Sequence, residues 1–217
     1  MTSEAQKPGE KPAKTLSALL IVISAPSGGG KTTLCQQLLA ARPETARAIT
    51  CTTRQPREGE RDMVDYYFLD PAAFLKRVQA GHFLEHATVH GNSYGTLKSE
   101  VLGKLRQGRD VLLNVDVQGA SAIRERAEQD GELKRALVSV FLTPPSIGIL
   151  EARLRKRATD SEGVIQKRLS VARQEIAQWK HFDYLLLSAS VSEDLRRMQA
   201  IIEAEKMRTA RALPPNI

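Results

Sequence analysis

Three consecutive glycines followed by a lysine make the segment ISAPSGGGKTTL suitable for binding a polyanion. Glycines let a backbone curl until successive N–H groups face a phosphate, and the helix expected next adds its positive N-terminal end. Lys31 is then placed to reach the β- and γ-phosphates of a nucleoside triphosphate, and the Thr32 hydroxyl to bind Mg²⁺. The segment follows the phosphate-loop pattern G-x-x-x-x-G-K-[ST], with Ala25 in place of the first glycine. A glycine-rich turn beside a surface lysine is the alternative interpretation.

A second group of anion-binding residue types lies in TCTTRQPREGERDMVDYYF, residues 50–68. Arg54 and Arg57 lie three residues apart beside hydroxyl side chains, and Tyr66 follows nine residues later. Guanidinium groups match pairs of phosphate oxygens, so these residues are candidates for a second phosphate site. A solvated charged surface is the alternative.

The segment GHFLEHATVHGNSYGTLKSE, residues 81–100, carries Glu85, Tyr94 and Thr96. Its alternating pattern predicts strands, where a lone glutamate usually faces solvent and a tyrosine often packs in the core. Histidines recur every four residues, a spacing that on a helix would suggest a metal site. In a strand context they are interpreted as surface or packing residues. They are His82, His86 and His90.

A basic segment, LEARLRKRATDSEGVIQKRLSVAR, spans residues 150–173. Arg153 and Arg157 lie four residues apart on one helix face, and Arg168 lies on the next expected helix. Mobile arginines that close over a triphosphate would neutralise charge during phosphoryl transfer. A solvated helix face or a nucleic-acid patch is the alternative.

The elements that must position these residues alternate between apolar runs and helical periodicity. Continuous apolar strands, each followed by a helix, predict an α/β fold whose mainly parallel sheet is covered on both faces. Asp70 and Pro71 are typical of a helix start. Residues 50–96 do not follow this alternation of strands and helices and predict a small, partly antiparallel inserted lobe. The expected strands are 18–24, 111–115, 137–142 and 184–187, and the expected helices are 31–41, 71–80, 118–129, 146–157 and 192–208.

Composition narrows the class of protein further. The 217 residues, 41% of them hydrophobic, suffice for one core with inserted lobes, and no apolar run reaches membrane-spanning length. Residues 1–16 are polar and predict a disordered tail. Cys35 and Cys51 do not form a disulfide framework, which favours a reduced, cytoplasmic setting. The net charge of +7 suits nucleic acid or small polyanions such as nucleotides.

Taken in order, these motifs resemble the guanylate kinase family from about residue 19 to 211. The resemblance rests on APSGGGKTT, TTRQPREGE, FLEHATVHGNSYGT, NVDVQGA, LTPPS and SEGVIQKRL. It implies a P-loop NTPase core of residues 17–49 and 97–217, a GMP-binding lobe of residues 50–96 and a helical lid at about 150–173. It also implies direct in-line transfer of the γ-phosphate of ATP, with Mg²⁺, to GMP and dGMP.

The resemblance implies a role for each matching residue. The ATP phosphates would be bound by Ser27, Gly28, Gly29, Gly30, Lys31, Thr32 and Thr33, with Thr32 also holding Mg²⁺. The phosphate of GMP would be bound by Arg54, Arg57, Tyr66 and Tyr94, and its guanine by Thr50, Glu85, Thr96 and Asp116. The catalytic residues would be Lys31, Arg153, Arg157 and Arg168. A carboxylate suits guanine because guanine presents two adjacent donors, N1–H and an amine, on one edge.

Among the departures of the chain from the family pattern, one concerns the expected Mg²⁺ site and one the expected adenine contacts. Asn114 occupies the first acid of a common D-x-D, and Ser188 and Ala189 stand where Asn-Asp often follows the last strand. The adenine contacts are therefore left open.

Three other functions remain as alternatives: a kinase-like binding module, a kinase of another phosphorylated sugar or nucleotide, and a nucleic-acid binder. The intact Gly30-Lys31-Thr32 favours a kinase, and Glu85 with Asp116 favours guanine. The expected partners are ATP and GMP, with no nucleic acid and no membrane, and a homo-oligomer is left open.

Overall fold

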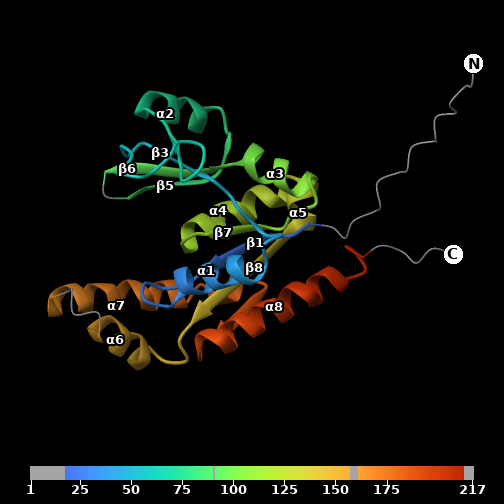
Figure 1. Cartoon of the computed structure of the whole chain (residues 1–217). Helices are drawn as coiled ribbons and strands as arrows, with labels where there is room; N and C mark the ends of the chain where they lie inside the picture. The colour runs from blue at the N-terminus through green and yellow to red at the C-terminus, as the bar shows by residue number, and fades with distance from the viewer. Residues whose placement is uncertain (1–17, 90, 157–160, 213–217) are drawn as a thin grey trace, which may run out of the picture.

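The computed structural model describes residues 18–89, 91–156 and 161–212 (Figure 1). The expected tail, His90 and Arg157 lie outside these ranges. Five parallel strands form the central sheet in the order β2-β7-β1-β8-β9. Their bounds are β1 Leu20–Ser24, β2 Ala46–Arg47, β7 Val111–Asn114, β8 Leu137–Thr143 and β9 Tyr184–Leu187.

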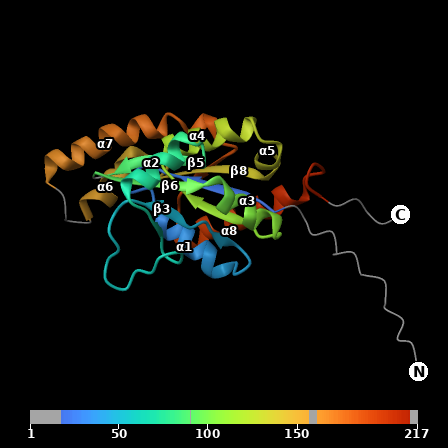
Figure 2. The same cartoon turned by 90° about the horizontal axis from the view of Figure 1, so that it is seen from above.

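Helices cover both faces of this sheet because its strands are apolar on both sides. Ile21 and Ile23 of β1 pack in one cluster with residues of α1 and α8, whereas Leu20 and Val22 pack in a second cluster with residues of α3, α4 and α5. Figure 2 shows α1 and α8 on the opposite side from α4 and α5. The bounds are α1 Lys31–Ala41, α3 Lys98–Arg106, α4 Val117–Glu128, α5 Gly131–Ala136 and α8 Val191–Met207.

A second sheet of four strands lies apart from the first, in the order β4-β3-β6-β5. The β3–β4 pair is parallel, and the other two pairs are antiparallel. The helix α2 (Pro71–Gln79) begins at Asp70, whose carboxylate accepts from the Ala73 N–H at 2.8 Å. It packs through Phe74, which stacks on Phe83 at 4.6 Å between ring centroids. The strands are β3 Thr50–Thr52, β4 Tyr67–Phe68, β5 Phe83–Val89 and β6 Asn92–Leu97.

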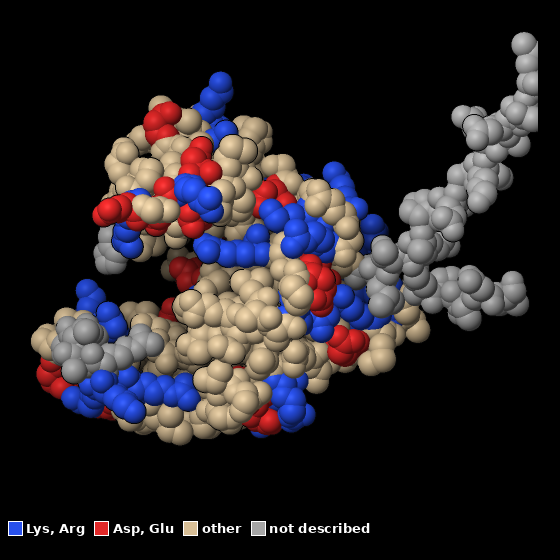
Figure 3. Space-filling model, in the orientation of Figure 1, with Lys and Arg blue, Asp and Glu red and all other residues tan. Residues whose placement is uncertain are grey.

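Two helices, α6 (Ile147–Lys156) and α7 (Glu162–Ile176), pack against each other where the sequence predicts a lid. Their contact is apolar and includes Leu154 and Leu169. Arg155 of α6 also bonds to Glu162 of α7. The 3₁₀ turn Trp179–His181 then leads to β9. In Figure 3 the surface is hollowed between this helix pair and the part of the molecule that carries the second sheet.

The predicted α/β fold, with a mainly parallel sheet flanked by helices, is confirmed. The predicted helix 31–41 and strand 184–187 have the observed bounds, and the other predicted elements differ by one or two residues at the ends that the structure describes. The elements that the sequence did not predict include β2, α3 and α5. Two are very short, and α3 begins after Leu97, which has no capping side chain. The second sheet lies in the range expected for the lobe and extends one residue beyond it; the division into core, lobe and lid stays a prediction.

Candidate active site

The phosphate loop joins the end of β1 to the start of α1 and depends on its glycines. Gly28 and Gly30 have φ values of +86° and +97°, which side-chain-bearing residues rarely adopt. A Cβ on Gly29 would lie 2.9 Å from the Pro26 carbonyl oxygen. No side chain caps the N-terminus of α1, so its first N–H groups stay available to an anion. The loop lines a cavity of about 310 Å³ together with Asp116 and Glu175.

Lys31 points across the end of the sheet. Its ammonium group donates to the carbonyl oxygen of Val115 at 2.6 Å, just beyond β7. Burial lowers the pKa of Lys31, whereas the nearby charges of Asp116, Cys35 and Glu175 oppose that shift. The lysine is thus tethered beside the loop in the absence of phosphate.

Glu175 is a residue at this site that the sequence did not suggest. It lies near the end of α7, and its carboxylate accepts from the Ser27 N–H of the phosphate loop at 3.4 Å. Burial raises the pKa of this carboxyl group. The loop therefore faces an acidic oxygen in the space that the sequence assigns to phosphates.

A cavity of about 420 Å³ opens beside the phosphate loop, between the two sheets. It brings together seven of the predicted residues, namely Thr32, Thr50, Tyr66, Glu85, Tyr94, Thr96 and Asp116. Asn114 and Arg47 also line it. We call this cavity the acceptor pocket.

Glu85 and Thr96 form a hydrogen-bonded pair in the wall of the acceptor pocket. They face each other across the β5–β6 register, and the Thr96 hydroxyl donates to Glu85 at 2.7 Å. Burial raises the pKa of Glu85; the bonds from Thr96 lower it, and the charge of Asp116 raises it further. The pair presents a mostly buried carboxylate whose orientation is fixed.

Asp116 has a structural task as well as its predicted one. It caps α4, and its Oδ1 accepts from the Gly119 N–H at 2.7 Å. A Cβ on Gly119 would lie 3.1 Å from the Val115 Cβ and 3.4 Å from Glu85 Oε2, so a glycine lets the helix approach this closely. An aspartate just before a helix is a cap signal that the sequence already contained.

Arg54 lies against the aromatic residues of the acceptor pocket. Its guanidinium sits 5.4 Å from the centre of the Tyr66 ring, and Tyr66 packs edge-on to Tyr94 at 6.3 Å. Glu60 holds Arg54 through two hydrogen bonds of 2.9 and 3.0 Å. It also accepts from the Arg57 N–H at 2.7 Å. Glu60 thus organises both predicted phosphate-binding arginines, a role that the sequence did not indicate.

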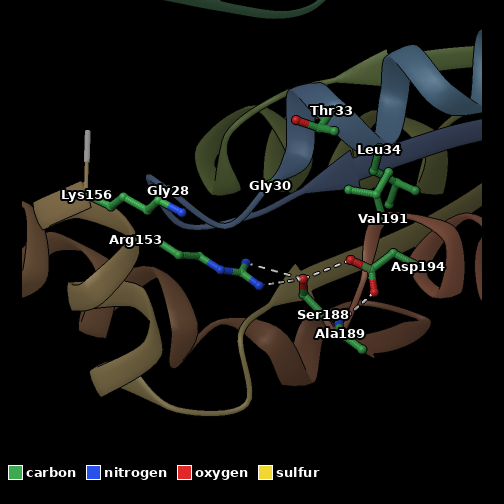
Figure 4. Close-up of a pocket in the computed structure, with 10 residues that line it drawn as sticks. All are labelled: Gly28, Gly30, Thr33, Leu34, Arg153, Lys156, Ser188, Ala189, Val191 and Asp194. Carbon is green, nitrogen blue, oxygen red and sulfur yellow. Dashed lines mark hydrogen bonds between the residues drawn. The ribbon is translucent and has the colours of Figure 1, made fainter.

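Two of the predicted lid arginines, Arg153 and Arg168, do not line the acceptor pocket. Arg153 lines a separate cavity of about 410 Å³, beside Gly28 and Gly30. Figure 4 shows that its guanidinium points to Ser188. Arg168 is half-buried on α7. The predicted site is therefore distributed over three parts of an open cleft.

Two other observations concern the described ranges of the chain only. They contain no cluster of three or more His, Cys, Asp or Glu side chains able to hold a metal ion. They also contain no helix with the length and apolar character needed to cross a bilayer.

Comparison with known proteins identifies similar sequences and a similar structure. A sequence model of the guanylate kinase family matches residues 17–205. The guanylate kinase of Carboxydothermus hydrogenoformans is 42% identical over 193 residues, covering 89% of this chain and 91% of the relative. That of Coxiella burnetii is 44% identical over 190 residues, covering 88% and 89%. A crystal structure of guanylate kinase from Anaplasma phagocytophilum superposes with a TM-score of 0.68 at 32% identity, covering 91% of this chain and 90% of that one.

Proposed function

Because this chain belongs to the guanylate kinase family and transfers a phosphate group from ATP to GMP, we propose that its residues divide the reaction among the phosphate loop, the acceptor pocket and the lid. One observation carries this proposal: Thr32 and Asp116 line both the loop cavity and the acceptor pocket. A γ-phosphate bound at the loop would then lie next to an acceptor in the pocket. Direct in-line transfer between them needs no covalent intermediate.

The loop from Ser27 to Thr33 binds the ATP phosphates through its N–H groups and the N-terminus of α1. In this proposal Lys31 exchanges its bond to the Val115 carbonyl for phosphate oxygens, and Glu175 gives up the Ser27 N–H. For the Lys31 ammonium group and the Ser27 N–H, the exchange replaces one oxygen acceptor by another.

We assign Mg²⁺ to the Thr32 hydroxyl. The donors that line both cavities are oxygen atoms of Thr32 and Asp116, the ligand type that Mg²⁺ prefers. Asn114 lies at the end of β7 in the same pocket and offers an amide oxygen. When bound, the ion would neutralise charge on the ATP phosphates.

Guanine recognition is assigned to Glu85, Thr96, Thr50 and Asp116. The Glu85 carboxylate accepts from N1–H and the exocyclic amine of guanine, whereas adenine presents an unprotonated N1 that a carboxylate repels. The Thr96 hydroxyl holds the carboxylate in place at 2.7 Å. Sites that pair such buried groups can reject an analogue by about 10⁴–10⁵.

The phosphate of GMP is assigned to Arg54, Arg57, Tyr66 and Tyr94. Glu60 raises the pKa of Arg54 and fixes its guanidinium against Tyr66, so the cation is already oriented. The dianionic phosphate would meet two arginines and two phenol hydroxyls, a set that matches its oxygens.

The negative charge that develops on the transferring phosphate is proposed to be neutralised by Arg153, Arg157 and Arg168. Arginines supplied in this way are worth about 10³–10⁵ in rate in kinases and related enzymes. Water competes as a nucleophile, so lid and lobe must close before transfer.

The location of the protein is proposed from its two cysteines. Cys35 and Cys51 are both free and buried, which supports a reducing, cytoplasmic setting. A homo-oligomer and the use of dGMP stay open proposals.

A coupled assay of ADP release tests the assignment, with GMP, AMP, UMP and CMP offered in parallel. We expect turnover with GMP. Replacing Glu85 by Gln puts an amide donor against a guanine donor, so Glu85→Gln should raise the KM for GMP far more than the KM for ATP. An equal rise for both substrates would show that Glu85 is structural.

A further inference from the structure

A chain of hydrogen bonds connects Arg153 to a buried carboxylate in the cavity beside the phosphate loop (Figure 4). Nη1 and Nη2 of Arg153 donate to the Ser188 hydroxyl oxygen at 3.3 and 3.2 Å. The Ser188 hydroxyl in turn donates to Oδ2 of Asp194 at 2.8 Å. The three residues come from α6, from the residue after β9 and from the first turn of α8.

The direction of every hydrogen bond in this chain is determined. Asp194 is 6% exposed, and its Oδ1 accepts from the Ala189 N–H at 2.8 Å, so the carboxylate is fixed from two sides. The proton of Ser188 is directed to Asp194, which leaves the serine lone pairs for the guanidinium. Buried polar groups satisfied in this way restrict one another to a single arrangement.

The chain of bonds also holds Arg153 close to the phosphate loop. A Cβ placed on Gly30 would lie 4.0 Å from Arg153 Nη1, so the guanidinium passes next to the loop. Two of the five guanidinium N–H groups donate to Ser188, and these two bonds do not use the other three. A neutral hydroxyl orients the guanidinium and leaves its positive charge in place. A carboxylate bonded directly to the guanidinium would offset that charge.

We propose that Ser188 and Asp194 are positioning residues that hold the Arg153 guanidinium beside the phosphate loop for phosphoryl transfer. The proposal rests on the role assigned to Arg153 above. It concerns a part of the chain where the resemblance left the contacts open, because Ser188-Ala189 replaces an Asn-Asp pair. The carboxylate of this cavity is supplied by α8.

A double-mutant cycle tests the proposal, with kcat measured at saturating ATP and GMP. Ser188→Ala should lower kcat about tenfold in the wild-type protein, the effect of losing one orienting hydrogen bond to a charged group. In an Arg153→Ala background the same change should have no further effect, because there is no guanidinium left to position. Ser188→Thr keeps the hydroxyl and should restore most of the lost kcat.

Controls separate positioning from folding. Asp194→Asn keeps the shape and the bond from the Ala189 N–H while removing the charge, and should lower kcat with little change in the KM for GMP. Ser192→Ala removes an exposed hydroxyl on the same first turn of α8 and should leave kcat unchanged. The melting temperature of each variant shows whether the fold is intact.

The outcomes distinguish this proposal from the one on which it rests. If Arg153→Ala lowers kcat but Ser188→Ala does not, or if Ser188→Ala is equally harmful in both backgrounds, the positioning role is wrong and the role of Arg153 stands. If Arg153→Ala retains wild-type kcat, the catalytic role of Arg153 fails, and the positioning role fails with it.

Discussion

The Lys31 ammonium group is bonded to a backbone carbonyl that it can leave when phosphate binds. Its bond to the Val115 carbonyl is the contact that phosphate would replace, and Lys31 belongs to none of the apolar clusters of the described residues. Lys31→Ala should therefore lower kcat by about 10²–10³, as removal of a single charge-stabilising group does. Melting curves should show an intact fold, and Lys76→Ala, on the exposed side of α2, serves as the matched control. Turnover at the wild-type level would show that this loop does not bind the triphosphate.

Glu85 illustrates how a binding residue can cost stability. Burial raises its pKa in the folded protein, so between the unfolded and folded pKa values the native state binds more protons than the unfolded state. The free energy of unfolding must then decrease as pH rises through this window. Above the folded pKa, the protein bears the whole loss of stability that comes from ionising the buried Glu85 carboxyl group. Below the unfolded pKa, the carboxyl group is protonated in both states and this loss is absent.

Glu85→Gln removes this titration and should change the pH dependence of stability. As pH rises through the window between the unfolded and the folded pKa of Glu85, the free energy of unfolding of the wild type should fall relative to that of the variant, because only the wild type must ionise a buried carboxyl group. Urea unfolding of both proteins at several pH values measures the difference. A difference that does not change with pH would mean that Glu85 titrates alike in the folded and unfolded chain.

The residues that sequence reasoning found differ in kind from those it missed. Glu85 and Thr96 were found because the motif that contains them resembles a family motif, and the strand register then places them opposite each other. Glu60 and Asp194 were missed because their hydrogen bonds depend on how irregular loops fold back on them, and Glu175 because its partner lies far away in the sequence. No spacing along the chain reveals that α7 reaches the phosphate loop 148 residues away.

Among the elements, α7 connects two parts of the site that are distant in sequence. It carries Arg168 within its length and Glu175 near its end, where the carboxylate meets the Ser27 N–H. A movement of this helix toward bound ATP would therefore move a cation and an anion together. The helix therefore contacts the phosphate loop through the Ser27 N–H while it also carries a predicted lid arginine.

Glu175→Gln should increase the affinity of the loop for ATP. The amide oxygen can still accept from Ser27, so only the negative charge that faces the incoming phosphates is lost. We expect the KM for ATP to fall about fivefold, the effect of removing about 1 kcal/mol of repulsion, the value for two unit charges roughly 4 Å apart in water. The KM for GMP should stay constant and serves as the internal control. A higher KM for ATP would indicate that the carboxylate supports the loop rather than competing with phosphate.

Elements with a strong hydrophobic pattern were predictable, and those defined by tertiary contacts were not. The apolar runs of β1, β7 and β8 are largely buried on both faces, so their composition alone identifies them. The run of β9 is equally apolar, although Leu185 and Leu187 stay exposed on one face. The two residues of β2 form a strand only because β7 lies beside them. Helix α3 has no capping residue, and its apolar face, including Val101 and Leu105, packs in the core instead.

At the scale of the whole molecule, the cationic groups of the site are kept apart. Arg54 and Arg57 belong to the second sheet and its loop, Arg153 and Arg168 to α6 and α7, and the cleft in Figure 3 lies between them. Guanidinium groups gathered without an anion would repel one another, so an open arrangement is favoured in the empty protein. Phosphate groups offset that repulsion and bind the closed state more tightly.

Closure can be measured between spin labels on the two sides of the cleft. Leu75 of α2 and Val164 of α7 are 56% and 41% exposed, and labels at Leu75→Cys and Val164→Cys should approach each other when a bisubstrate analogue binds. Cys35 and Cys51 should not react, because both are buried and burial raises the pKa of each thiol to about 11.

A control pair and a graded set of ligands make the closure measurement decisive. Labels at Gln129 and Met207, both exposed and both at the ends of helices that pack on the central sheet, should keep a constant distance. ATP alone should draw α6 and α7 inward through the arginines of the lid, GMP alone should draw in the second sheet, and the analogue should do both. This order follows from the separation of the charges, because each ligand offsets repulsion in the part of the cleft that it occupies. Unchanged distances between the cleft labels at saturating analogue would contradict closure and leave a rigid, preformed site.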